Sequence, residues 1–73
     1  MESIYITTDY IQLGQFLKLA GVIDTGGMVK WFLSEHEVLV NAERENRRGK
    51  KLYPGDRIVI EGVGSFTITK KEE

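Results

Sequence analysis

The sequence predicts an α+β fold in which two short helices pack on a small, mainly antiparallel sheet. Two stretches, 10–20 and 26–35, repeat apolar residues at the spacing of one helix face. Runs rich in β-branched and aromatic residues lie before and after this helix pair and end at turn residues, which indicates strands. Because helices this short can bury their apolar stripes only against a further surface, we expect the strands to form that surface.

The first helix is predicted from Tyr10 to Ala20. Asp9 is a suitable N-cap, and Gln12 three residues later completes a pattern similar to a capping box. Gly21 supplies the left-handed residue that commonly ends a helix. The apolar stripe that would face the core consists of Leu13, Phe16, Leu17 and Ala20.

The second helix is predicted from about Gly26 to Glu35, with Asp24 or Thr25 as its N-cap. His36 stands at its end, where it could take the left-handed conformation and complement the negative end of the helix dipole. The apolar stripe of this helix consists of Val29, Phe32 and Leu33.

Three runs after the helix pair are predicted strands, and one run before it is a possible strand. The first two, "EVLVN" at 37–41 and "DRIVIEG" at 56–62, are rich in Val and Ile, and "SFTIT" at 65–69 follows. The possible N-terminal strand is "SIYIT" at 3–7. Turns are predicted at Asn41-Ala42 and Pro54-Gly55-Asp56.

Length and composition favour one folded domain over residues 1–73. The chain has 41% hydrophobic residues, 29% charged residues and a single proline, which is typical of a globular domain. It has no cysteine, no signal-peptide pattern and no apolar run of the roughly 20 residues that span a bilayer. We therefore expect a cytoplasmic protein with no membrane association.

No pattern in the sequence indicates catalysis. The one histidine, His36, has no cysteine to accompany it, so we expect no metal site. The stretch "TGGMVK" lacks the glycine spacing and the lysine-serine/threonine ending of a nucleotide-binding loop. We expect no enzyme activity, no cofactor and no small-molecule substrate.

The charges are arranged unevenly, although the net charge is only −1. Residues 35–43 hold three carboxylates and no Lys or Arg, whereas residues 44–51 hold five cations and one carboxylate. Several Lys and Arg side chains on one surface can neutralise RNA phosphates and release condensed counterions. The predicted RNA-binding residues are Arg47, Arg48, Lys50 and Lys51, which flank Gly49, where the backbone can bend. The alternative is a solvated loop that only keeps the domain soluble.

Further candidates lie on the predicted helices. Thr25, Gly26 and Gly27 begin the second helix, where free backbone N–H groups could bind a phosphate, although a Gly-Gly pair more often only makes a tight turn. Lys18 and Lys30 each lie off their apolar stripe and could extend the positive surface, or could simply be solvated.

Two aromatic residues allow two interpretations. Trp31 points away from the stripe of its helix and could stack on an unpaired base, but packing against the sheet or the N-terminal strand is favoured. Tyr53, just before Pro54, has the same two interpretations, and packing is again favoured.

From Leu13 to Ile60 the sequence resembles the RNA-binding domain of ribosomal protein S-four, also called the alpha-L motif. The resemblance rests on Thr25 at a helix start, on the apolar stripe that follows, on "VLVN" at 38–41 and on "PGDRI" at 54–58. The segments at 16–21, 25–30 and 47–52 look like those of small stand-alone proteins of the YaaA or YbcJ-like group. The sequence departs from the family at Gly26, where many members have arginine, and at His36 and Ala42, where glycine is usual.

The resemblance implies binding of structured RNA through the start of the helix pair and the adjacent basic loop. It also implies a role in ribosome assembly or RNA-linked regulation, with ribosomal RNA or a ribosomal subunit as the partner. A second hypothesis is a protein-interaction adaptor whose basic loop docks on an acidic protein surface. The sequence does not indicate an oligomeric state.

Overall fold

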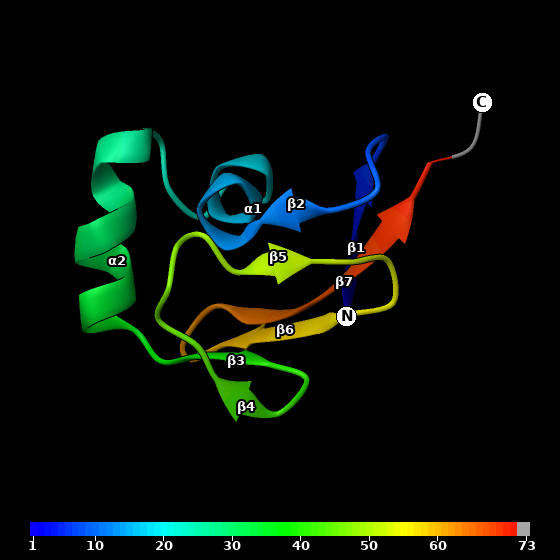
Figure 1. The fold of residues 1–73 in the computed structure, drawn as a ribbon. Coiled ribbons are helices and arrows are strands. Elements are labelled where there is room, and N and C mark those ends of the chain that lie inside the picture. The colour runs from blue at the N-terminus through cyan, green and yellow to red at the C-terminus, as the bar shows by residue number, and fades with distance from the viewer. Residues whose placement is uncertain (72–73) are drawn as a thin grey trace.

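One face of a five-stranded sheet packs against a layer made by α1 (Leu13–Leu19), with α2 (Val29–Glu35) at the end of that layer (Figure 1). The computed structural model describes residues 1–71. The strand order is β1-β7-β6-β3-β4, and β2 and β5 form a separate two-stranded sheet beside α1. The strands are β1 (Glu2–Ile6), β2 (Ile11–Gln12), β3 (Val38–Val40), β4 (Glu43–Arg44), β5 (Lys51–Leu52), β6 (Arg57–Ile60) and β7 (Gly64–Lys70).

The α+β prediction is confirmed, and one strand pair makes the larger sheet mixed. Strand β1 runs parallel to β7, whereas β7, β6, β3 and β4 pair antiparallel in turn. Buried residues alternate with more exposed ones along β1, β3, β6 and β7, as expected of a sheet with one covered face, whereas both residues of the edge strand β4 are exposed. The covered face consists of Ile4, Ile6, Val38, Val40, Ile58, Ile60, Phe66 and Ile68.

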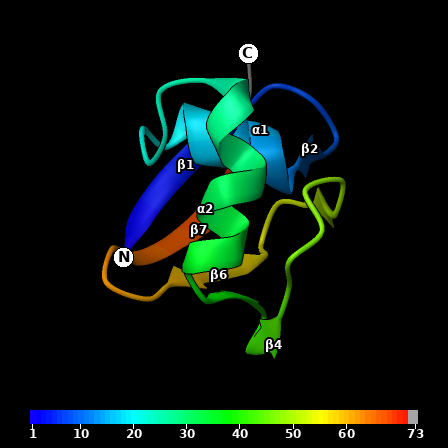
Figure 2. The same cartoon turned by 90° about the vertical axis from the view of Figure 1, so that its left-hand side faces the viewer.

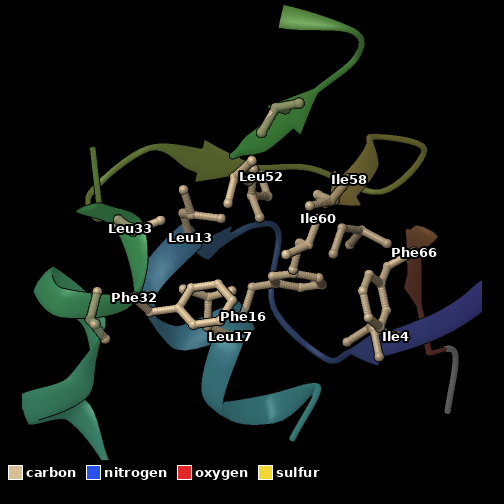
Figure 3. Packing of buried hydrophobic residues seen from close by; sticks show 14 of the residues in the cluster. Ile4, Leu13, Phe16, Leu17, Phe32, Leu33, Leu52, Ile58, Ile60 and Phe66 are labelled. Carbon is tan, nitrogen blue, oxygen red and sulfur yellow. The ribbon is translucent and has the colours of Figure 1, made fainter. Parts of the chain in front are cut away.

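The core lies between this sheet face and the apolar stripes of the two helices (Figure 3). Leu13, Phe16 and Leu17 of α1 are each 0% exposed, which confirms most of the predicted stripe. The ring of Phe16 meets the edge of Phe66 with 5.4 Å between centroids, which joins helix to sheet. Leu52 of β5, also 0% exposed, closes the core beside α1.

The predicted start of the first helix is wrong by three residues. Helix α1 begins at Leu13, because Ile11 and Gln12 pair with β5 instead of continuing a helix. Asp9 is not the N-cap and binds Lys70 Nζ at 2.9 Å. Gln12 is the N-cap residue, and its backbone N–H donates to Gln15 Oε1 at 3.3 Å.

The end of the first helix is as predicted. Gly21 has a φ of 75°. Its N–H donates to Lys18 O at 3.0 Å, and the N–H of Val22 donates to Leu17 O at 3.0 Å. This pair of bonds is the Schellman arrangement, which satisfies the last carbonyls of α1 and turns the chain toward α2.

The second predicted helix occupies its expected range but begins with a tighter turn. Residues Gly26–Met28 form the 3₁₀ turn η1, and the α-helix proper begins at Val29. The predicted left-handed conformation of His36 is wrong, because His36 is extended, with a φ of −125°. Its ring stacks on Phe32 with 4.3 Å between centroids.

The start of α1 is bonded to the segment that precedes β5. The N–H of Leu13 donates to Lys50 O at 2.8 Å, and the N–H of Gly14 donates to Arg48 O at 2.9 Å. A Cβ on Gly14 would lie 3.3 Å from Val29 Cγ1 and 3.5 Å from Arg48 O. The lack of a side chain at position 14 therefore eases the approach of α1 to Val29 of α2, whereas the contact with Arg48 would be an ordinary one.

The two predicted turns are also present, and the first contains an unusual residue. Asn41 and Ala42 join β3 to β4 with φ values of 51° and 71°, the pattern of a type I′ hairpin turn. Asn41 suits this conformation, and its side chain accepts from Arg57 N at 3.0 Å and donates to Asp56 Oδ1 at 3.1 Å. Ala42 adopts it without any such side-chain group.

In the described residues, no helix has the length and apolar character that crossing a membrane would require.

Replacing Ala42 by glycine should stabilise the protein by about 0.5–1 kcal/mol, since relief of the left-handed strain exceeds the added entropy of the unfolded chain. Urea unfolding would measure the gain as a higher midpoint. Asn41→Gly is the matched control: it lies in the same turn but loses two hydrogen bonds, so it should not stabilise. Equal gains from both changes would contradict the assignment of strain to Ala42.

Gly14→Val should destabilise the protein by about 1–3 kcal/mol, because the new side chain would overlap Val29 and the carbonyl of Arg48. Valine has a better intrinsic helix propensity than glycine, so a loss of stability reports the close contact and not the helix itself. Leu19→Val, at an exposed position of the same helix, should change the unfolding free energy much less. An unfolding free energy of Gly14→Val equal to that of the wild type would show that the space between position 14, Val29 and Arg48 can hold a larger side chain.

Candidate RNA-binding surface

The basic segment, residues 47–51, follows β4, ends in the first residue of β5 and contains Arg47, Arg48, Lys50 and Lys51. The N–H of Lys50 donates to Arg47 O at 3.1 Å, so Arg48 and Gly49 occupy the centre of a turn. The predicted bend at Gly49 is therefore present, although Gly49 is not among the glycines with positive φ. Arg47, Arg48 and Lys51 are exposed, and Lys50 is half-buried.

Backbone bonds to α1 fix the place of this segment. Figure 1 shows it running from β4 past α2 to the start of α1, and then into β5. The carbonyls of Arg48 and Lys50 accept the first two N–H groups of α1, which would otherwise lack partners. The segment is thus not a free loop, and its backbone has a defined position at the start of α1.

Glu45 orients Arg47, a contact that no pattern in the sequence predicts. Glu45 Oε2 accepts from the backbone N–H and from Nε of Arg47, each at 3.0 Å, and Glu45 Oε1 accepts from Nη2 at 3.1 Å. These side-chain hydrogen bonds, with the backbone bond and the nearby positive charge, lower the pKa of Glu45 to about 2. The carboxylate therefore remains charged near neutral pH and holds the guanidinium at a fixed angle.

A cleft of about 590 Å³ lies between the β3–β4 hairpin and the basic segment. Arg47, Lys50 and Lys51 line one side of it together with Tyr53. Arg44, on the hairpin side, also lines this cleft, but its guanidinium binds Glu37 at 3.3 Å. Glu43, Glu45 and Asp56 also line the cleft, so its four cations face three carboxylates, of which Glu45 is bonded to Arg47.

Lys30 and Arg48 line one hollow although they come from distant parts of the chain. This hollow, of about 440 Å³, lies between α2 and the basic segment and is also lined by Leu33, Ser34 and Asn46. Figure 2 shows α2 in front, with the segment between β4 and β5 passing beside it. The predicted extension of the positive surface across α2 has this structural basis.

Lys18 is linked to the basic segment through Tyr10. Lys18 and Tyr10 line a hollow of about 710 Å³ with Ile11, Gln15 and Leu19. On the other side of Tyr10, Lys51 Nζ lies 4.8 Å from the centre of the tyrosine ring, a cation–π distance. Tyr10 thus borders both the hollow that Lys18 lines and the ammonium group of Lys51.

Thr25, Gly26 and Gly27 are exposed and precede α2. Thr25 is the N-cap of the 3₁₀ turn, but its side chain makes no capping hydrogen bond. Gly26 and Gly27 belong to this 3₁₀ turn, and the α-helix begins only at Val29, so the aligned N–H groups expected there are divided between two short elements. The phosphate contact at Thr25 stays a prediction.

The favoured interpretation of Trp31 is wrong, whereas Tyr53 packs on one side against Tyr10 and is otherwise exposed. Trp31 is 55% exposed and lies with its ring edge-on to His36 at 6.2 Å, instead of packing on the sheet. Tyr53 is 48% exposed, and its ring meets Tyr10 with 5.8 Å between centroids. Tyr10 was assigned to the first helix from the sequence, and only the β2–β5 pairing places it beside the basic segment.

The chemistry that this surface can perform is anion binding. In residues 1–71 no group of three or more His, Cys, Asp or Glu side chains converges as a metal site would require. Glu45 has a pKa lowered to about 2 because its carboxylate accepts hydrogen bonds from Arg47, so this shift reports an ion pair.

A model of the S4 domain family matches residues 4–69 of the chain. The chain is also 69% identical, over 65 residues, to a protein of Bacillus subtilis (strain 168) named probable ribosome maturation protein RlbA. That alignment covers 89% of this chain and 92% of the relative. No solved structure matches the chain.

The family match spans nearly all of the described residues and includes both helices and the basic segment. It confirms the resemblance found in the sequence and the prediction of a non-catalytic RNA-binding protein. The chain therefore belongs to the S4 domain family of RNA-binding proteins.

Proposed function

We propose that this protein binds ribosomal RNA through a basic surface and acts in ribosome maturation in the cytoplasm. The basic surface is defined here as Lys18, Lys30, Arg47, Arg48, Lys50 and Lys51. The observation that carries the proposal is the pair of hydrogen bonds by which Leu13 and Gly14 hold the carbonyls of Lys50 and Arg48. These bonds give the backbone that carries the cations of the loop a constant position at the start of α1.

Fixed cations favour a folded RNA over a flexible polyanion. Phosphates of a structured RNA stand at set spacings, so side chains that are already in place lose little conformational entropy on binding. Arg47 presents a planar guanidinium oriented by Glu45, and Arg48 and Lys30 lie on either side of one hollow. Such contacts recognise the shape and backbone of RNA more than its sequence.

The ribosome is proposed as the source of this RNA because of the close relative. The Bacillus subtilis protein, which is 69% identical and similar in length, is named a probable ribosome maturation protein. Thr25, Gly26 and Gly27 are proposed as additional contacts at the edge of the surface, where the start of η1 is exposed.

The double variant Arg48→Gln, Lys50→Gln should bind ribosomal RNA at least 10-fold more weakly than the parent at low salt. The slope of log affinity against log salt should fall by about 2, roughly one for each lost phosphate contact. Filter binding to purified ribosomal subunits and to extracted ribosomal RNA, at several salt concentrations, would measure both quantities.

The matched control is Arg57→Gln, Lys71→Gln, which removes the same two charge types. Arg57 precedes buried Ile58 on β6 and so projects from the opposite face of the sheet, and Lys71 follows β7. Near-parental binding is expected for this control. If both double variants bind alike, the site assignment is wrong, and if the parent binds subunits but no RNA, docking on a protein surface replaces the proposal.

The ion pair inside the basic surface should show a defined pH dependence. Because the pKa of Glu45 is lowered from 4.5 to about 2, its interaction with Arg47 stabilises the folded state above pH 4.5 and is lost as the pH falls toward 2. The difference in unfolding free energy between the parent and Glu45→Gln should therefore shrink over that range. A difference that stays constant from pH 5 to pH 2 would contradict the ion pair.

A further inference from the structure

We propose that the ring of Tyr53 is a stacking surface for one unpaired RNA base, a role that rests on the proposed RNA-binding function. Tyr53 lines a hollow of about 540 Å³ whose other lining residues all come from the basic segment, namely Arg47, Gly49, Lys50 and Lys51. A nucleotide placed there would meet an aromatic face and several cations at once. The hollow therefore has the two components that single-stranded nucleic acid requires.

The ring is held on a fixed backbone although it is 48% exposed. The N–H of Tyr53 donates to Asp56 Oδ2 at 2.8 Å, and the N–H of Asp56 donates back to Tyr53 O at 2.9 Å. The turn between them is tied to β7, because the N–H of Gly55 donates to Ile68 O at 2.8 Å. Pro54 restricts the backbone further. An exposed ring on so constrained a turn is already arranged for a ligand.

Tyr10 acts as a positioning residue for this ring. The two rings are tilted by 47° with 5.8 Å between centroids, so Tyr10 supports Tyr53 from one side. Lys51 Nζ lies over the ring of Tyr10, 4.8 Å from its centre. The ammonium group is thereby kept beside the hollow that Tyr53 lines.

Phosphate binding alone gives no reason for an aromatic ring at this place. Cations neutralise phosphates without aromatic help, whereas unpaired bases in RNA loops and bulges stack on exposed Tyr, Phe or Trp rings. Tyr53 is thus expected to select RNA in which a base has left its helix next to the phosphates that the basic segment contacts.

The test uses two RNA duplexes that are identical except for one bulged 2-aminopurine nucleotide. The variants are Tyr53→Leu, which removes the aromatic face, and Tyr53→Phe, which keeps it. Tyr5→Leu is the matched control, since Tyr5 is 59% exposed and lies between buried Ile4 and Ile6, on the opposite face of the sheet. Circular dichroism would verify folding of each variant. Affinity, its salt slope and 2-aminopurine fluorescence are the readouts.

The parent should prefer the bulged RNA by about 5-fold to 150-fold, the range of one base–aromatic stack, and should quench the 2-aminopurine. Tyr53→Phe and Tyr5→Leu should keep the preference. Tyr53→Leu should bind both RNAs alike, with an unchanged salt slope.

Two other results separate the failure of this inference from that of the proposed function. A parent that binds both duplexes equally, or a Tyr53→Leu variant that keeps the preference and the quenching, would overturn the stacking role while leaving salt-dependent RNA binding intact. Absence of salt-dependent binding to either RNA, even in dilute buffer, would overturn the proposed function itself.

Discussion

The bonds between the first residues of α1 and the basic segment determine how the candidate surface is built. Helix α1 needs acceptors for its first N–H groups, and the carbonyls of Arg48 and Lys50 supply two of them. The backbone of the basic segment thus supplies hydrogen-bond acceptors to α1, while the side chains of the same segment carry the positive charge. A Cβ on Gly14 would be in ordinary contact with Arg48 and tight only against Val29 Cγ1, so the glycine chiefly eases the approach of α1 to α2 beside the segment. Fold and candidate site therefore depend on the same few atoms.

A protein of net charge −1 can still present a strongly positive surface, because folding separates its charges. Lys18 and Lys30 come from two helices, and the remaining cations of the basic surface come from one segment. Arg44 lies close to that segment in sequence but is bonded to Glu37, and Glu45 is bonded to Arg47. Acidic residues within the neighbouring sequence thus orient or pair with some cations and leave others exposed toward a polyanion.

The sequence predicted the elements whose signals are local. The apolar stripe of α1, the helix end at Gly21 and the Asn41-Ala42 turn each depend on residues a few positions apart. The β2–β5 pair was missed because each strand has two residues and is specified only by its distant partner. Because this pair was missed, the first helix was predicted to begin too early, and the position of Tyr10 beside Lys51 was not predicted. The Glu45–Arg47 pair and the exposure of Tyr53 depend on side-chain geometry, which periodicity does not report.

The place of β7 in the sheet has a consequence for how the chain folds during synthesis. Strand β7 lies between β1 and β6, so the N-terminal strand has no neighbour in the sheet until residues 64–70 have been made. Until then Ile4 and Ile6 lack the strand that holds them over the core, and β1 can join the sheet only after β7 has been made. Completion of the sheet must therefore wait for a contact between segments about as distant as the sequence allows, which slows folding relative to a helical protein of similar size.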